Sequence, residues 1–136
     1  MKKYFLTTCI MALFAIGFAS SEESEEAKER HGTYVITDVN GVTWTFALLD
    51  KHQVTARKEG MSEDDMYYGH WTLFSKSCML SFTDFHAGNP QIAFPNGTVW
   101  SDSECMELGF DGYLYKSDTY LTSKNPNGRI KWTKTN

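Results

Sequence analysis

Basic residues are too few in this 136-residue sequence to build a strongly positive surface. Thirteen Lys and Arg stand against seventeen Asp and Glu, which gives a formal net charge of −4 at pH 7. Nucleic acids and anionic membrane surfaces are bound through clusters of Lys and Arg that neutralise phosphates. We therefore expect neither a nucleic acid nor a membrane surface as a partner.

Long apolar runs are missing except at the N-terminus. Two lysines precede the mostly apolar segment Tyr4–Phe18, and Ala19 ends a small-x-small cleavage signal. The apolar run is shorter than the roughly 20 residues that span a bilayer. Residues 1–19 therefore predict a secretory signal peptide and not a membrane-spanning anchor. The mature chain is expected in the periplasm or outside the cell.

Cysteine is scarce, with three residues in the chain. Cys9 would leave with the signal peptide, so the exported chain keeps only Cys78 and Cys105. Disulfides persist outside the cytoplasm, and two cysteines allow only one pairing. We predict a Cys78–Cys105 disulfide, and the alternative is two buried free thiols.

The sequence motifs of common enzymes are missing as well. There is no Gly-x-Ser-x-Gly, no phosphate-binding glycine loop and no Cys–His pair with an expected free thiol. Asp84 and His86 share one face of a predicted strand and could transfer protons or ligate a metal. A metal needs three or four ligands, and the other histidines are scattered along the chain. We expect no metal and no cofactor, and favour a non-enzymatic protein.

Apolar residues are nearly missing from residues 20–31, where Ala27 is the single apolar side chain among five Glu. Such a segment buries too little apolar surface to offset the entropy lost on ordering. We expect a solvated acidic tether with a transient helix around Glu25–Arg30. Residues 32–136 are then expected to form a single domain.

What the chain has in abundance, from Gly32 onward, is short segments in which apolar and polar residues alternate. This period of two is typical of half-buried strands. Hairpin links dominate and no helix long enough for a crossover is predicted, which favours an all-β, antiparallel up-and-down meander of about 8–10 short strands closing into a small barrel. A β-sandwich is the alternative. The strand-like segments are Thr33–Asp38, Val42–Leu49, His52–Lys58, Met66–Ser75, Ser77–His86, Gln91–Phe94, Thr98–Ser101, Glu104–Phe110, Tyr113–Ser117, Tyr120–Ser123 and Arg129–Lys134.

Four turn dipeptides separate these segments and predict type I′ hairpin turns, whose two central residues both need positive φ. We expect the tight turns at one closed rim of the barrel. The polar loops Glu59–Asp65 and Ala87–Pro90 are then expected at an open rim, next to any site. The dipeptides are Asn40-Gly41, Asn96-Gly97, Asp111-Gly112 and Asn127-Gly128.

The first predicted strand opens with Gly32-Thr33-Tyr34. This resembles the lipocalins and related calycins, small exported barrels whose first strand opens with Gly-x-Trp. In that family the aromatic ring closes one barrel end against a basic residue of the last strand. The resemblance implies that Tyr34 replaces the Trp, that Arg129 or Lys131 supplies the cation, and that an eight-stranded barrel holds a small apolar ligand.

Aromatic residues make up 15% of the chain. Those on the inward faces of predicted strands could line a cavity for a small apolar or amphipathic molecule, or simply fill a core. We expect such a ligand carrier as the function. The candidate ligand-binding residues are Trp44, Phe46, Trp71, Phe82 and Trp100.

An exposed tyrosine face is the alternative site. Tyr is favoured at interfaces because its ring is rigid and its tip is polar. The protein would then be a secreted β-domain with a filled core that binds a protein or a glycan through surface aromatic residues. The candidate tyrosines are Tyr67, Tyr68, Tyr113, Tyr115 and Tyr120.

Overall fold

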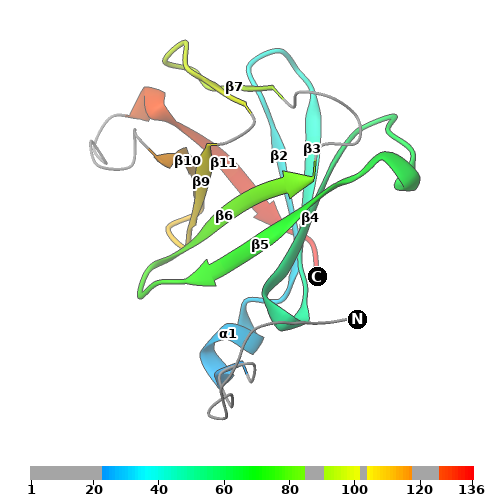
Figure 1. Ribbon diagram of the computed structural model, residues 1–136. Coiled ribbons are helices and arrows are strands. Elements are labelled where there is room, and N and C mark those ends of the chain that lie inside the picture. Colours follow the sequence, from blue (N-terminus) through cyan, green and yellow to red (C-terminus); the bar gives the residue numbers. More distant parts are fainter. Residues whose placement is uncertain (1–22, 85–90, 102–103, 118–125) are drawn as a thin grey trace.

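The main body of the protein is a closed antiparallel barrel of eight strands (Figure 1). The computed structural model describes residues 23–84, 91–101, 104–117 and 126–136. The strands follow one another around the barrel in up-and-down order, β10-β11-β2-β3-β4-β5-β6-β9, and the order closes where β9 pairs with β10. The predicted all-β barrel is therefore confirmed, and the sandwich is not formed.

The described strands lie close to segments predicted from the alternating pattern, and the predicted strand Tyr120–Ser123 lies outside the described residues. Two further short strands, β7 and β8, form a separate hairpin. The elements are α1 (Glu25–Glu29), β2 (Gly32–Thr37), β3 (Thr43–Leu48), η3 (Asp50–His52), β4 (Gln53–Lys58), η4 (Glu63–Asp65), β5 (Tyr67–Leu73), β6 (Ser77–Asp84), β7 (Ile92–Ala93), β8 (Val99–Trp100), β9 (Cys105–Gly109), β10 (Tyr113–Lys116), η5 (Pro126–Gly128) and β11 (Arg129–Lys134).

Alternation along each strand separates the core from the outer surface. In β3, Trp44, Phe46 and Leu48 point inward and are at most 1% exposed, whereas the residues between them are half-buried on the outside. Successive side chains of a strand point to opposite faces, so one parity fills the barrel. Each large apolar side chain buried in this way stabilises the fold by about 1.5–3 kcal/mol.

The last strand joins the first strand of the barrel. β11 pairs antiparallel with β2, so that Trp132 lies opposite Ile36 and Lys134 opposite Tyr34. The backbone N–H of Thr33 also donates to Oδ1 of Asn136 at 3.1 Å. Among the described strands, this pairing leaves no long unpaired edge in the wall of the barrel.

The Asn-Gly turn between β2 and β3 differs from the predicted type I′ turn. Gly41 has φ +81°, but the φ of Asn40 is not positive. The N–H of Gly41 donates to Asp38 O at 3.0 Å, and the N–H of Asp38 donates to Val42 O at 2.9 Å. This is a type I turn followed by a glycine bulge, a three-residue loop that Asn-Gly also suits. The turns at Gly97 and Gly112 repeat it.

Positive φ at two successive residues occurs instead between β3 and β4. Lys51 has φ +56° and His52 has φ +60°, as at the centre of a type I′ turn. The N–H of Gln53 donates to Asp50 O and completes the turn. Non-glycine residues rarely adopt this conformation, which costs roughly 1–2 kcal/mol per residue. The surrounding contacts must therefore hold it.

Strand direction decides which loops share a rim. Successive strands run in opposite directions, so the β2–β3 turn, the β4–β5 loop and the segment before β11 lie at one rim. Asn40-Gly41 therefore shares its rim with Glu59–Asp65, and Asp111-Gly112 lies at the other. The predicted separation of tight turns from polar loops is wrong, because alternation assigns rims regardless of loop length. Ala87–Pro90 lies outside the described residues.

Residues 23–31 contain the short helix α1, in a segment where a solvated tether with a transient helix was predicted. Ser24 caps α1 by accepting the N–H of Ala27 at 3.1 Å. Ala27 is 1% exposed and belongs to the core cluster. The ammonium of Lys134 donates to the carbonyl of Glu29 at 3.3 Å. The buried Ala27 and the contact from the last strand help to dock this short helix on the barrel.

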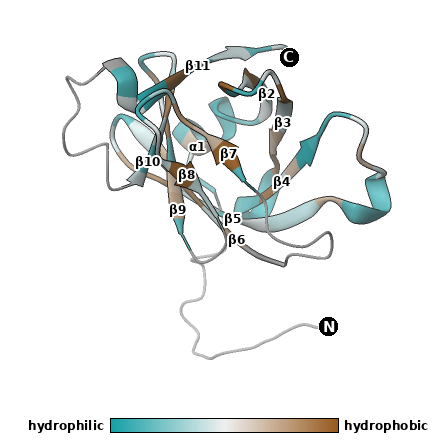
Figure 2. Cartoon of the chain, turned by 90° about the horizontal axis from the view of Figure 1, so that it is seen from above, coloured by the Kyte–Doolittle hydropathy of each residue, from teal (hydrophilic) through white to brown (hydrophobic). Residues whose placement is uncertain are grey.

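The β7–β8 hairpin and α1 lie at opposite ends of the barrel (Figure 1). Seen from above, both fall within the ring of strands, and β7 carries the hydrophobic colour (Figure 2). Ile92, Phe94 and Trp100 of the hairpin region are at most 1% exposed. The N–H of Val39 donates to Ala93 O at 3.1 Å and ties the hairpin to the β2–β3 turn. Both ends of the barrel are therefore covered.

Candidate functional site

The five aromatic residues predicted to line a cavity all lie inside the protein, and none is more than 2% exposed. The ring centroids of Phe46 and Phe82 are 6.3 Å apart, and those of Phe82 and Trp100 are 5.5 Å apart. Trp44 stacks on Tyr67 at 6.0 Å. These distances are typical of aromatic rings packed against one another in a core. Ligand binding by these residues stays a prediction.

One polar group in this core lacks a partner. Nε1 of Trp44 is buried and makes no hydrogen bond, whereas Nε1 of Trp71 donates to Leu49 O and Nε1 of Trp100 donates to Glu104 O, both at 3.0 Å. A buried donor without a partner costs about 1–3 kcal/mol. Among the five predicted ligand-binding residues, Trp44 is therefore the one whose side chain has a hydrogen-bond donor without an acceptor.

A groove of about 400 Å³ lies on the outside of the barrel over β4 and β5. Gln53 lies opposite His70 in the ladder between these strands, and Thr55 lies opposite Tyr68. These four side chains point to the outer face of the sheet. Of the residues between them, Val54 points inward and Gly69 has no side chain. Leu49, at the end of β3, completes the groove.

Among the residues that the structure describes, the lining of this groove contains no Asp, Glu, Lys or Arg. Leu49 and Tyr68 are each 40% exposed and supply an apolar surface. Gln53, Thr55 and His70 supply hydrogen-bond donors and acceptors. An aromatic ring beside uncharged polar groups suits a neutral, hydroxyl-rich ligand.

The floor of the groove contains a bulge that only glycine permits. Gly69 pairs with Phe82 while Tyr68 pairs with Asp84, so the register shifts between the two residues. A Cβ on Gly69 would lie 2.0 Å from Ser81 O. β6 therefore approaches β5 more closely here than any side chain would allow, and bulges of this kind re-aim neighbouring side chains such as Tyr68.

The predicted tyrosine face is not formed by the described tyrosines. Tyr67 and Tyr115 are each 2% exposed. Tyr113 is half-buried beneath the guanidinium of Arg129, whose Cζ lies 4.1 Å from the ring centroid. Tyr68 alone is exposed, and Tyr120 lies outside the described residues.

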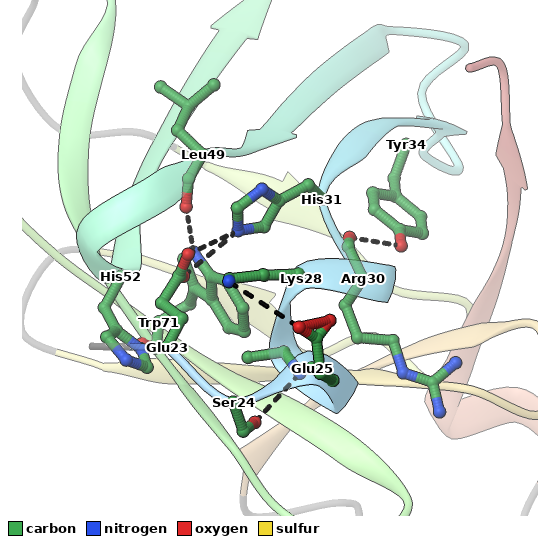
Figure 3. A network of polar contacts seen from close by, with 11 residues as sticks. Glu23, Ser24, Glu25, Lys28, Arg30, His31, Tyr34, Leu49, His52 and Trp71 are labelled. Atoms are coloured by element: carbon green, nitrogen blue, oxygen red, sulfur yellow. Dashed lines mark hydrogen bonds and ion pairs between the residues drawn. The ribbon is translucent and has the colours of Figure 1, made fainter.

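A second cluster lies where the N-terminal segment meets the β3–β4 turn (Figure 3). The Glu23 carboxylate contacts Nε2 of His31 at 2.9 Å and accepts the backbone N–H of His52. Nδ1 of His52 lies 3.1 Å from Trp71 O, and both imidazole rings contact the Trp71 ring. The cluster holds His52 in its positive-φ conformation and fastens the N-terminal segment to the barrel.

The charge state of Glu23 depends on its partners. The Glu23 side chain is only 6% exposed, and burial by itself would raise the pKa of its carboxyl group. The hydrogen bonds and charges of His31 and His52 outweigh burial and lower the pKa below its usual 4.5. Glu23 is therefore ionised in the folded protein near neutral pH.

Tyr34, the residue on which the lipocalin resemblance was based, contacts two residues of β11. Its ring meets Trp132 edge-on at 5.0 Å, and Nζ of Lys134 lies 5.5 Å from its centroid. Its hydroxyl donates to Arg30 O at 2.7 Å. Arg129, the expected cation, lies over Tyr113 because the β11 register places Lys134 opposite Tyr34.

Cys78 and Cys105 are both free in the structure, so the predicted disulfide is not formed. Cys78 pairs with Leu108, whereas Cys105 pairs with Ser81. The two cysteines are thus displaced by three residues, about 10 Å along the strands, and they point to opposite faces of the sheet. A disulfide requires Cα atoms within about 7 Å and facing side chains.

The other candidate chemistry has no support among the described residues. They contain no group of three or more His, Cys, Asp and Glu that could hold a metal. The side chain of Asp84 and the whole of His86 lie outside the described part of the chain. Within that part, no helix has the length and apolar character needed to cross a membrane.

Comparison with known proteins adds no further information. No family model matches the chain, and no match is found among curated proteins or solved structures. We therefore infer the function from the geometry of the structure.

Sequence analysis named Tyr68 but missed its neighbours in the groove. Gln53, Thr55 and His70 carry the outward parity of β4 and β5, and the pattern could have shown this. Their pairing depends on the register of the two strands, which no local motif reports. The Glu23 cluster was missed for a related reason, since its members are far apart in sequence.

We predict that Glu23→Gln makes the protein less stable by about 1 kcal/mol at pH 7, because a hydrogen-bonded buried charge is lost. The folded-state pKa of Glu23 is depressed, so its contribution is complete above pH 4.5 and is lost as the pH falls through the folded pKa. Urea unfolding of both proteins between pH 3 and pH 7 should show the difference shrinking below pH 4.5. Glu26→Gln, an exposed change in α1, the helix that follows Glu23, serves as the control. A constant difference across this range would contradict the assignment.

We predict one reactive thiol in the native chain lacking residues 1–19, and two after unfolding. Cys105 is half-buried and can react, whereas Cys78 is fully buried and burial raises its pKa to about 12. Thiol reactivity requires the thiolate. Titration with a chromogenic disulfide reagent, without added reductant, measures both numbers. Finding no free thiol in the unfolded chain would show that the disulfide forms after all.

Proposed function

We propose that this protein is an exported, non-catalytic binding domain that takes a neutral glycan in the groove over β4 and β5. The observation that carries the proposal is the juxtaposition of Tyr68 with three uncharged hydrogen-bonding side chains in a groove of about 400 Å³. Small-ligand sites of this size combine an apolar wall with a few convergent polar groups. The signal peptide expected over residues 1–19 supports export to the periplasm or beyond.

A protein partner is less well supported. Stable protein interfaces bury roughly 1,200–2,000 Å², and their centres are rich in aromatic residues. Of the exposed large apolar residues that the structure describes, only Leu49 and Tyr68 share the groove. The remaining ones belong to separate loops or strands, among them Val39 and Phe74. The groove therefore suits a small ligand better than a protein surface.

A lipocalin-like ligand carrier is the second candidate. An eight-stranded, up-and-down closed barrel is compatible with that architecture. The specific observation in its favour is the unpaired Nε1 of Trp44 inside the barrel. A small amphipathic molecule with a hydrogen-bond acceptor could satisfy this donor if the β7–β8 hairpin opened. The covered ends and the ring contacts of the core favour the outer groove.

We predict that Tyr68→Ala weakens glycan binding at least about tenfold, because losing one stacking surface costs at least about 1.4 kcal/mol. The measurement is calorimetric titration with the best ligand from a panel of immobilised neutral oligosaccharides. Phe74→Ala removes an aromatic ring that is 48% exposed and lies outside the groove, and it should leave the affinity unchanged. Equal losses in both variants, or no binding by the unmodified protein to any member of the panel, would overturn the proposal.

A further inference from the structure

A second pocket, of about 370 Å³, lies at the end of the barrel covered by α1. Its lining residues lie at or just after the C-terminal ends of α1, β5 and β9, so these three ends meet there. Unlike the groove over β4 and β5, its lining carries positive charge from Arg30 and Lys76. The other lining residues are Ser75, Gly109, Phe110 and Asp111.

Arg30 is the unusual member of this pocket. Its guanidinium carbon lies 3.9 Å from the centroid of the Phe110 ring, which holds the planar group in place. Its Nε is buried and has no hydrogen-bond partner. Figure 3 shows the side chain turned away from Glu23 and Glu25, toward the strands beyond the helix.

No carboxylate in the described part of the chain forms an ion pair with Arg30. Glu23 pairs with His31, and Glu25 pairs with Lys28. Asp111 also lines the pocket, but its carboxylate accepts the Tyr115 hydroxyl and the backbone N–H of Tyr113. Partly buried arginines are normally paired, because an unpaired donor costs free energy. Within the described part of the chain, no carboxylate therefore pairs with the charge of Arg30 or accepts a hydrogen bond from its Nε.

We propose that this pocket binds a small molecule that carries an oxyanion group, either a carboxylate or a phosphate. The guanidinium of Arg30 binds this group. A guanidinium already stacked on an aromatic ring is held in one orientation and loses little entropy when its fork meets an oxyanion. Lys76 adds a second positive charge, and Ser75 adds a hydroxyl donor. The site is separate from the proposed glycan groove, shares no residue with it, and needs no glycan to function.

The test is an NMR titration of the isotope-labelled chain lacking residues 1–19. The two probes added are benzoate and phenyl phosphate. We expect both, or the preferred one of them, to shift the amide signals of Gly109, Phe110 and Asp111 saturably. Benzamide has the same ring without the charge and should shift them at least about tenfold less at equal concentration. The stronger of the two anions identifies the oxyanion as carboxylate or phosphate.

Arg30→Met should abolish these shifts, because it keeps an apolar stem and removes the guanidinium. Arg57→Met is the matched control, since Arg57 is an exposed arginine on β4, outside the pocket, and should leave them unchanged. If the first variant does not fold, Lys76→Ala provides a second one, with an expected loss of anion affinity of about threefold to tenfold.

Equal responses to benzoate and benzamide, no saturable shift, or anion binding that survives both pocket variants would overturn the proposal. Tyr68→Ala should not affect anion binding, so the two proposals can fail separately.

Discussion

The pairing of β11 with β2 is the interaction on which the rest of the structure depends. It brings the C-terminal strand back to the first one, so that Lys134 lies opposite Tyr34 and the sheet closes. Closure gives every strand one inner and one outer face. The inner parity fills the barrel with aromatic rings, α1 and the β7–β8 hairpin cover its ends, and chemistry that needs access to solvent is left to the outer face and the rims. Both proposed sites follow from this division.

The strands of the wall could be predicted from sequence because each depends on local alternation. Trp44, Phe46 and Leu48 repeat every second residue, and the barrel places all three inward as that period requires. Turn positions were also evident, since Asn-Gly and Asp-Gly are rarely tolerated elsewhere. The turn type was not evident, because the same dipeptides suit both a type I′ turn and a type I turn with a glycine bulge. The φ of Asn40 and the hydrogen bonds at Gly41 distinguish them.

Features that depend on distant parts of the chain could not be predicted. Whether Cys78 and Cys105 meet depends on the register between β6 and β9, and that register displaces them by three residues. The docking of α1 depends on the place that Ala27 finds in the core. The positive φ of His52 depends on Glu23, which lies 29 positions earlier, and the residues around His52 do not predict it. Each of these is a tertiary contact that overrides the local preference of the sequence.

A packed barrel interior leaves the outer wall as the place where we propose that the glycan binds. The most direct test is an NMR titration of the labelled mature chain with the selected oligosaccharide, observing backbone amides and tryptophan indole N–H signals together. We expect shifts at Gln53, Tyr68 and His70, with the indole signals of Trp44 and Trp100 unchanged. Large shifts of the two indole signals, with unchanged amides on β4 and β5, would contradict this expectation and place the ligand inside the barrel.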